Sequence, residues 1–123
     1  MPSLACPFCI EGPNVLANAL AVARWDTHPV TPGHILILSR RHVANFFEIS
    51  ADERASLFDL LHQARQLLQS EHNPDGFNVG VNVGEVAGQT IGHVHIHLIP
   101  RYRGDTPQPR GGVRGVIPDK QSY

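Results

Sequence analysis

Residues 93–99 place a histidine at every second position, at His93, His95 and His97. Side chains of a β-strand point alternately to its two faces, so the three imidazoles share one face of a strand. The residues between them are apolar and predict that the opposite face is buried. Imidazole titrates near neutral pH, so this row suits a nucleophile, a proton donor or a metal ligand.

The middle histidine is best placed to act as a nucleophile. His95 has an imidazole on either side, and these could orient it or protonate a leaving group. A phosphate substrate also needs donors for its non-bridging oxygens, and Gly88, Gln89 and Thr90 before the strand supply backbone, amide and hydroxyl groups. The alternative, a surface strand that is rich in histidine by chance, does not account for this flanking tripeptide.

Cys6 and Cys9 form a C-x-x-C pair close to the N-terminus. A redox-active pair would follow a strand and open a long helix, whereas a glycine and a proline follow this one. The pair therefore favours half of a tetrahedral metal site, although both cysteines could also be small buried hydrophobic residues. Spacing alone does not choose the other ligands among the histidines at 28, 34, 42, 62, 72 and in the triad.

Asp26 lies beside Trp25 where a strand is expected to end. A carboxylate there can accept hydrogen bonds from both hydroxyls of a ribose, and the nearby aromatic ring can flank a base. The residues alone favour a simpler role, in which Asp26 forms a turn before Thr27, His28 and Pro29.

The apolar pattern predicts the elements that must position these side chains. Strands are expected as two short segments in 14–26 and at 34–39, 77–83 and 90–99. Ser50 and Glu53 predict a helix start, and residues 73–76 predict its end. Between them, apolar side chains recur at helical spacing, at Leu57, Leu60, Leu61, Ala64, Leu67 and Leu68. Strands on both sides of one long helix predict an α+β fold with an antiparallel sheet.

The composition is that of a globular protein. The 123 residues suit a single domain, with 41% hydrophobic and 17% charged residues. The net charge of −1 argues against a nucleic-acid partner, and no apolar run approaches the length of a membrane span. The first residues lack the pattern of a secretory signal, so we expect a cytoplasmic protein. Glycine and proline recur after Arg101 and predict an extended tail over 106–123 that is ordered only if something holds it.

Together these residues resemble the histidine-triad (HIT) superfamily of nucleotide hydrolases and transferases, whose motif residues 93–99 match at every position. The resemblance covers about residues 5–105, and the segments 32–34, 40–42 and 87–90 match the family pattern in order. Residues 99–105 are similar to bacterial members and to the fragile-histidine-triad hydrolases of dinucleoside polyphosphates. The resemblance implies a five-stranded antiparallel sheet with one long helix and a short helix, and a symmetric homodimer.

The resemblance also implies an activity. His95 would attack the α-phosphate of a purine nucleotide conjugate, such as a dinucleoside polyphosphate, and form a nucleotidyl-histidine. The alternatives are a nucleoside phosphoramidate or acyl-nucleotide hydrolase, and a nucleotide-binding protein with little turnover. The implied supporting residues are His97 at the phosphate, His34 behind it, Gly88, Gln89 and Thr90 at the phosphate or leaving group, Asn82 near the substrate, Asp26 at the ribose, and Phe8 and Trp25 at the base.

Members that carry an N-terminal C-x-x-C resemble a zinc-bearing branch of the superfamily. The positions that match its ligands are Cys6, Cys9, His42 and His93. The resemblance implies a structural zinc ion with no open coordination position, which would anchor the strand that carries His95.

Overall fold

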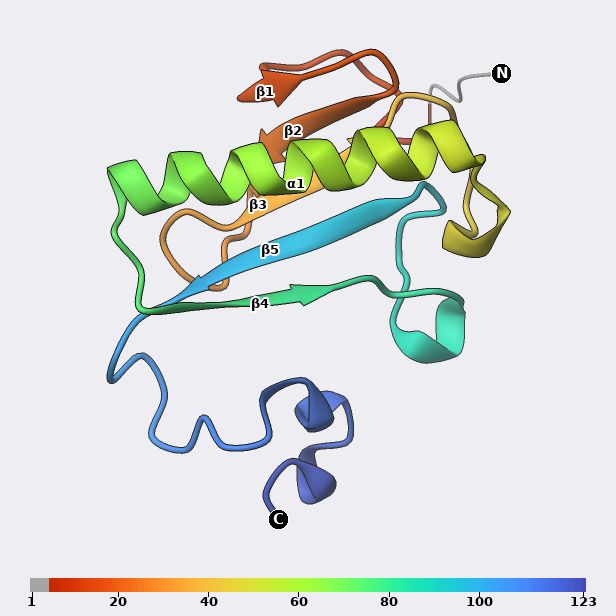
Figure 1. Ribbon diagram of the computed structural model, residues 1–123. Helices are drawn as coiled ribbons and strands as arrows, with labels where there is room; N and C mark the ends of the chain where they lie inside the picture. The colour runs from red at the N-terminus through yellow and green to blue at the C-terminus, as the bar shows by residue number, and fades with distance from the viewer. Residues whose placement is uncertain (1–4) are drawn as a thin grey trace.

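The computed structural model describes residues 5–123 as one sheet covered on one face by a long helix (Figure 1). All neighbouring strands are antiparallel, in the order β1-β2-β3-β5-β4. The strands are β1 (Leu16–Ala17), β2 (Ala21–Trp25), β3 (Ile35–Ser39), β4 (Gly76–Gly80) and β5 (His95–Arg101). The α+β fold and its five-stranded sheet are therefore confirmed.

Helix α1 (Ala51–Glu71) begins where the sequence predicted. The Ser50 hydroxyl accepts a hydrogen bond from the backbone N–H of Glu53, and the Glu53 carboxylate accepts one from the backbone N–H of Ser50. Arg41 binds the same carboxylate through two hydrogen bonds of 3.0 and 2.8 Å. The start of α1 is thereby tied to the segment that follows β3.

The hydrophobic core lies between α1 and the sheet. The helix buries one side chain per turn, and the strands contribute alternate residues, as a sheet with one covered face requires. The central members of this core are Leu57, Leu60, Ala64 and Leu68 from α1, Ala21 and Ala23 from β2, Ile35 and Ile37 from β3, and Ile96 and Leu98 from β5. Burying each large side chain stabilises the fold by about 1.5–3 kcal/mol.

The opposite face of the sheet has a smaller apolar cluster, formed by Val22, Leu36 and Leu38 with Phe8 packed against it. In the register of β3 and β5, Leu36 pairs with His97 and Leu38 pairs with His95. Because paired residues lie on the same face, both histidines point to this side, which we call the open face.

Two strand boundaries differ from the predictions. β4 begins at Gly76 and ends at Gly80, and β5 begins only at His95 and runs to Arg101. The chain between them makes the short 3-10 helix η2 (Glu85–Ala87), whose flanking residues Gly84 and Gly88 both have positive φ. This turn ends β4 early and delays the pairing of β5. A second 3-10 helix, η1 (Phe46–Glu48), precedes α1.

The tail was expected to be extended, and this prediction is wrong. It forms two 3-10 helices, η3 (Gly112–Val116) and η4 (Pro118–Lys120), of which η3 lies beside β4 (Figure 1). Local backbone hydrogen bonds within the tail replace an extended chain, including those from Arg114 N–H to Gly111 O and from Lys120 N–H to Ile117 O. Within the described residues 5–123, no helix is long and apolar enough to cross a membrane.

Candidate active site and metal centre

His95 has one ring nitrogen occupied and one free to react. Its Nδ1 lies 2.8 Å from the carbonyl oxygen of His93, and a carbonyl can only accept, so Nδ1 carries the proton and donates it. In the neutral ring, Nε2 then keeps its lone pair. The Phe8 ring packs edge-on against the His95 ring, with 5.0 Å between centroids, and helps to fix its orientation.

The proton positions on His34 and His97 follow from one backbone contact. The N–H of Val30 donates to His34 Nδ1 over 3.1 Å, so the neutral His34 ring carries its own proton on Nε2. His34 Nε2 lies 3.0 Å from His97 Nδ1 and donates to it. His97 must then hold its proton on Nε2. Burial lowers the pKa of both imidazoles, opposed in part by Asp26, which favours the neutral rings.

Asp26 combines the two roles that the sequence left open. One carboxylate oxygen accepts the backbone N–H of His28 over 2.8 Å, as a turn-forming aspartate does. The other lies 3.4 Å from His34 Nε2, at the edge of the site. Ligand atoms of Asp26, His34 and His97 lie within 4.8 Å of one another and could hold a cation by distance alone. The proton on His34 Nε2 argues against this, because a metal needs that lone pair.

A cavity of about 760 Å³ on the open face brings four of the predicted site residues together. Asp26, His34, Asn82 and His97 all line it. The opposite wall comes from the tail, so the cavity lies between the histidines, β4 and the C-terminal segment. Its size is that of a typical small-molecule site.

The segment 88–90 is organised differently from the predicted donor loop. The Gln89 side chain is engaged within the protein, because its Nε2 donates to Ala44 O and Ile91 O and its Oε1 accepts from Gly84 N–H. Gln89 therefore shapes the loop before the triad. Gly88 has a φ of 95°, which glycine adopts most easily, and the Thr90 side chain is exposed.

Trp25 does not belong to the open face. It follows Ala21 and Ala23 at alternate positions of β2, and both of those alanines lie in the core beneath α1. The Trp25 ring contacts the ring of His72 at the end of α1, with 6.2 Å between centroids. The prediction that Trp25 flanks a base is therefore not supported, because its side chain points to the helix side of the sheet.

Four side chains converge into a compact cluster at the start of the triad. Cys6, Cys9, His42 and His93 each offer one ligand atom, and these atoms lie within 4.8 Å of one another. The Cys9 Sγ–His42 Nδ1 and Cys6 Sγ–His93 Nδ1 distances are 3.1 and 3.5 Å, and the two Nδ1 atoms are 3.3 Å apart. A tetrahedral ion with bonds of about 2.0–2.3 Å has edges of about 3.3–3.8 Å between ligands. The cluster therefore fits a metal ion.

The tautomer of His93 also suits metal binding. His93 Nε2 lies 2.6 Å from the carbonyl oxygen of Ser39 and donates to it, which leaves the Nδ1 lone pair facing the two sulfur atoms. Burial lowers the pKa of His93, so the neutral ligand form is favoured. The remaining histidines that spacing left open, His28, His62 and His72, are exposed and outside this cluster.

Several contributing residues were missed at the sequence level. Arg24 donates from Nη2 to Ile10 O over 2.8 Å and from Nε to Asn14 Oδ1 over 3.2 Å, and so fastens the segment after the cysteine pair. Because Arg24 lies two residues before Asp26, the sequence predicts that the side chains of these two residues lie on the same face. Asn78 and Arg101 line the cavity, but no local sequence signal marks them.

Comparisons with known proteins agree with this architecture. The family profile described as "HIT domain" matches residues 10–104. The chain is 35% identical over 100 residues to the bifunctional bis(5'-adenosyl)-triphosphatase/adenylylsulfatase FHIT of Arabidopsis thaliana, covering 80% of this chain and 56% of that protein. It is 33% identical over 86 residues to a bis(5'-nucleosyl)-tetraphosphatase of Schizosaccharomyces pombe, covering 70% and 47%. The AP-4-A phosphorylase of Mycobacterium tuberculosis is 33% identical over 96 residues, with 77% and 49% covered. The chain spans about half the length of these relatives.

Solved structures give the same result. A HIT family protein from Bacillus anthracis superposes with a TM-score of 0.77 at 33% identity, covering 83% of this chain and 77% of that one. A Zn-bound histidine triad family protein from Mycobacterium smegmatis has the same fold, with a TM-score of 0.76 at 24% identity and 85% and 81% coverage. With its alternating histidines on β5, its five-stranded sheet and a family match over most of its length, the chain belongs to the HIT domain family.

Proposed function

We propose that this protein is a hydrolase or transferase that cleaves dinucleoside polyphosphates at the α-phosphate. The nucleotidyl group is carried on His95 as an intermediate. One observation carries the proposal. The hydrogen bond from His95 Nδ1 to His93 O, 2.8 Å long, leaves the Nε2 lone pair as the nucleophile. The relatives named as a triphosphatase, a tetraphosphatase and a phosphorylase of such compounds support this substrate class.

In the first step, His95 Nε2 forms a bond to the α-phosphorus while the bond from phosphorus to the bridging oxygen breaks. The leaving group takes the electron pair of that bond and departs as an anion. The positive charge that develops on the His95 ring is spread toward Nδ1–H, which strengthens its hydrogen bond to His93 O. His97 Nε2–H donates to a phosphate oxygen, where negative charge is concentrated.

The proton positions favour an anhydride over a phosphoramidate. His97 has one proton, on Nε2, and its Nδ1 already accepts from His34. Giving that proton away would leave an anionic ring, so His97 acts as a hydrogen-bond donor and not as an acid. A phosphate leaving group departs without a proton, whereas an amine leaving group requires one. In the second step, water attacks phosphorus, the bond to His95 breaks, and the nucleoside monophosphate departs with one proton released to solvent.

The other predicted site residues fit around this centre. We propose that Asp26 accepts hydrogen bonds from the ribose hydroxyls and that Asn82 holds a phosphate or sugar oxygen, since both line the cavity with His97. Phe8 and the apolar cluster of the open face offer a surface for the base. We assign Gln89 to holding the loop that leads into the triad.

We propose zinc as the metal of the Cys6, Cys9, His42 and His93 cluster. Two thiolates and two imidazoles form a ligand set that zinc prefers, and four protein ligands leave no position for a substrate. Bound there, the ion would stabilise the fold by holding the N-terminal segment against the start of the triad.

We also propose that two copies of the chain form a homodimer. The edge strands of the sheet, β1 and β4, offer hydrogen-bonding groups to another chain. Sedimentation velocity tests this directly: a monomer across the micromolar range would contradict the pairing.

The activity is tested by following release of nucleoside monophosphate from diadenosine tetraphosphate by the wild type and by His95→Asn. We expect the variant to lose several orders of magnitude in kcat while it still binds the monophosphate, because a covalent nucleophile has been removed. Near-normal hydrolysis by His95→Asn would contradict the mechanism. Binding without turnover in the wild type would favour a nucleotide-binding protein.

A further inference from the structure

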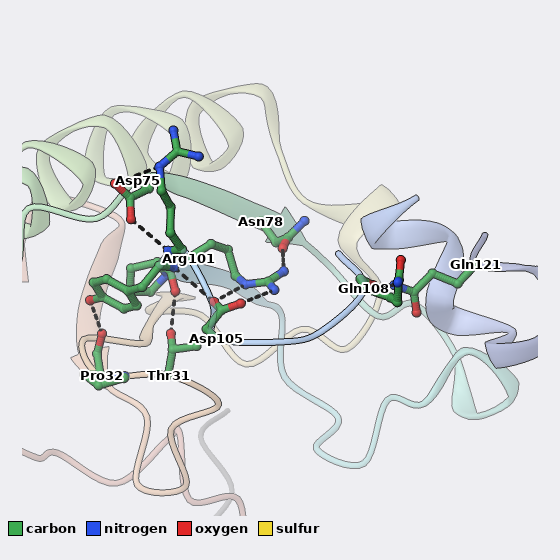
Figure 2. A network of polar contacts seen from close by, with 11 residues as sticks. Thr31, Pro32, Asp75, Asn78, Arg101, Asp105, Gln108 and Gln121 are labelled. Atoms are coloured by element: carbon green, nitrogen blue, oxygen red, sulfur yellow. Dashed lines mark hydrogen bonds and ion pairs between the residues drawn. The ribbon is translucent and has the colours of Figure 1, made fainter. Parts of the chain in front are cut away.

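The C-terminal segment 106–121 folds back on itself around Gln121. Gln121 Nε2 donates to Gln108 O over 3.1 Å, as Figure 2 shows. The Gln121 carbonyl lies directly against Gly111, where any β-carbon would overlap it, and Gly111 has a φ of 88°. A β-carbon at Gly115 would likewise meet the Gln121 side chain. The glycines of this segment therefore permit a closed fold that no other residue at position 111 could form.

A separate clamp sets the direction in which this segment leaves the sheet. Arg101, at the end of β5, forms two hydrogen bonds of 2.7 Å with the Asp105 carboxylate and a third with Asn78 Oδ1 on β4 (Figure 2). The Arg101 guanidinium lowers the pKa of Asp105 to about 2, so the pair is charged on both sides at neutral pH. The Asn78 amide nitrogen lies next to Gly112, because a β-carbon at Gly112 would be only 3.4 Å from it.

The folded segment forms one wall of the cavity that begins at the reactive histidines. His97 and Arg101 both line this cavity, so it extends along β5 over four residues, or roughly 13 Å. The cavity is thus continuous from the phosphate donor His97 to the tail. We call the part beside the tail the far part of the cavity. It is lined by Pro109, Val113 and Val116 together with the amides of Asn78 and Gln121.

The charges of the residues in this far part do not suit a ligand that ends in a free phosphate group. Among the described residues that line the cavity, Arg101 is the one arginine or lysine, and Asp105 neutralises it. The tail's own arginines are directed elsewhere: Arg110 and Arg114 lie over the Tyr123 ring, 5.0 and 4.7 Å from its centroid. Apolar walls with a few amides suit a flat, uncharged ring system such as a nucleoside base.

We propose that segment 106–121 forms a subsite for the distal nucleoside of the substrate, and that this subsite makes the enzyme select dinucleoside polyphosphates over nucleoside triphosphates. The inference rests on the proposed function, because both substrates present the same α-phosphate to His95. Only the dinucleotide has a second base to fill the far part of the cavity. A triphosphate has no second base for these walls, and it ends in a phosphate with one more ionisable oxygen than the internal phosphates of the dinucleotide, beside Asp105 and the valines.

The test compares kcat/KM for three substrates: diadenosine tetraphosphate, ATP and adenosine 5′-phosphorofluoridate, whose small leaving group does not reach the subsite. Gly111→Ala opens the folded segment, and Val116→Asp adds a charge at an exposed wall residue without a packing defect. Gly104→Ala is the matched control, because Gly104 also has a positive φ, of 82°, but has open space where its β-carbon would lie.

The wild type is expected to prefer diadenosine tetraphosphate to ATP by at least about tenfold, as a specific subsite contact allows. Both tail variants should lose most of this preference while they keep the rate with the phosphorofluoridate, and Gly104→Ala should keep both. Equal use of ATP and the dinucleotide by the wild type, or equal losses on all three substrates in both tail variants, would overturn the inference. Failure of the wild type to release AMP from the phosphorofluoridate would instead contradict the proposed function.

Discussion

The carbonyl oxygen of His93 accepts the Nδ1–H of His95 over 2.8 Å, while the ring of His93 contributes to the Cys/His metal cluster. One residue therefore joins the proposed zinc centre to the proposed nucleophile. A metal ion that fixes the position of His93 also fixes the atom that holds the His95 proton. A metal bound at this cluster would therefore help to orient the proposed nucleophile through His93.

Loss of one thiolate should remove metal, stability and activity together. We expect Cys9→Ser to reduce the zinc content from about one ion per chain and to lower the melting temperature, since structural zinc contributes directly to folding. Elemental analysis, calorimetry and AMP release measure the three effects. His62→Asn, on the exposed side of α1, is the control and should change none of them. If the wild type held no zinc and Cys9→Ser had the same melting temperature as the wild type, both cysteines would have only an ordinary packing role.

His34→Phe tests how the proton of His97 is positioned. Without the donor at His34 Nε2, the His97 ring loses the contact that keeps its proton on Nε2. We expect kcat to fall about a hundredfold with little change in KM, because a donor to the phosphate is misplaced. Nitrogen-15 NMR should show His97 as the Nε2–H tautomer in the wild type and as a mixture in the variant. An unchanged His97 tautomer in the variant would show that His34 does not have this positioning role.

Asp26→Ala tests recognition of the ribose. The carboxylate lines the cavity, and a charge-assisted hydrogen bond to a sugar hydroxyl contributes roughly 1.5–3 kcal/mol. The variant should therefore lose about tenfold or more in affinity for adenosine monophosphate but much less for its 2′-deoxy analogue. Isothermal titration measures both affinities. Equal losses for the two sugars would leave Asp26 with only its turn-forming hydrogen bond to His28.

Acid should destabilise the protein through Glu53. Its hydrogen bonds with Arg41 lower its folded pKa from an ordinary 4.5 to about 2. A carboxylate with a depressed folded pKa stabilises the fold above its unfolded pKa and loses that contribution as pH falls through the folded value. The free energy of unfolding should therefore decrease from about pH 4.5 to about pH 2.

Urea titrations at successive pH values measure this decrease. Glu53→Gln should be less stable at neutral pH and should show a flatter pH dependence over the same interval. Asp59→Asn changes an exposed carboxylate of the same helix and should retain the wild-type slope. A wild-type slope in Glu53→Gln would show that other carboxylates cause the acid sensitivity.

The elements with a strong local pattern were predictable from the sequence. The helix start at Ser50 and Glu53 and the shared face of His95 and His97 follow from local hydrogen bonding and period-two alternation, and both are present. The face of Trp25 was also predictable, because Ala21 and Ala23 precede it at alternate positions of β2.

The remaining features depend on contacts between distant segments. The fold of the tail requires Gln121 to reach Gly111 and Gln108, and no local periodicity encodes that pairing. The tautomers of the histidines likewise depend on single backbone groups, such as Val30 N–H on His34, that become neighbours only after folding.

The most direct test of the covalent intermediate on His95 is the intact mass of the protein during turnover of diadenosine tetraphosphate, with the reaction stopped without acid. A fraction of the chains is expected to be heavier by one adenylyl group, with the added mass located on the peptide that carries His95, and no such species is expected in His95→Asn. Turnover without any covalent adduct, or an adduct on another residue that persists in His95→Asn, would contradict this intermediate.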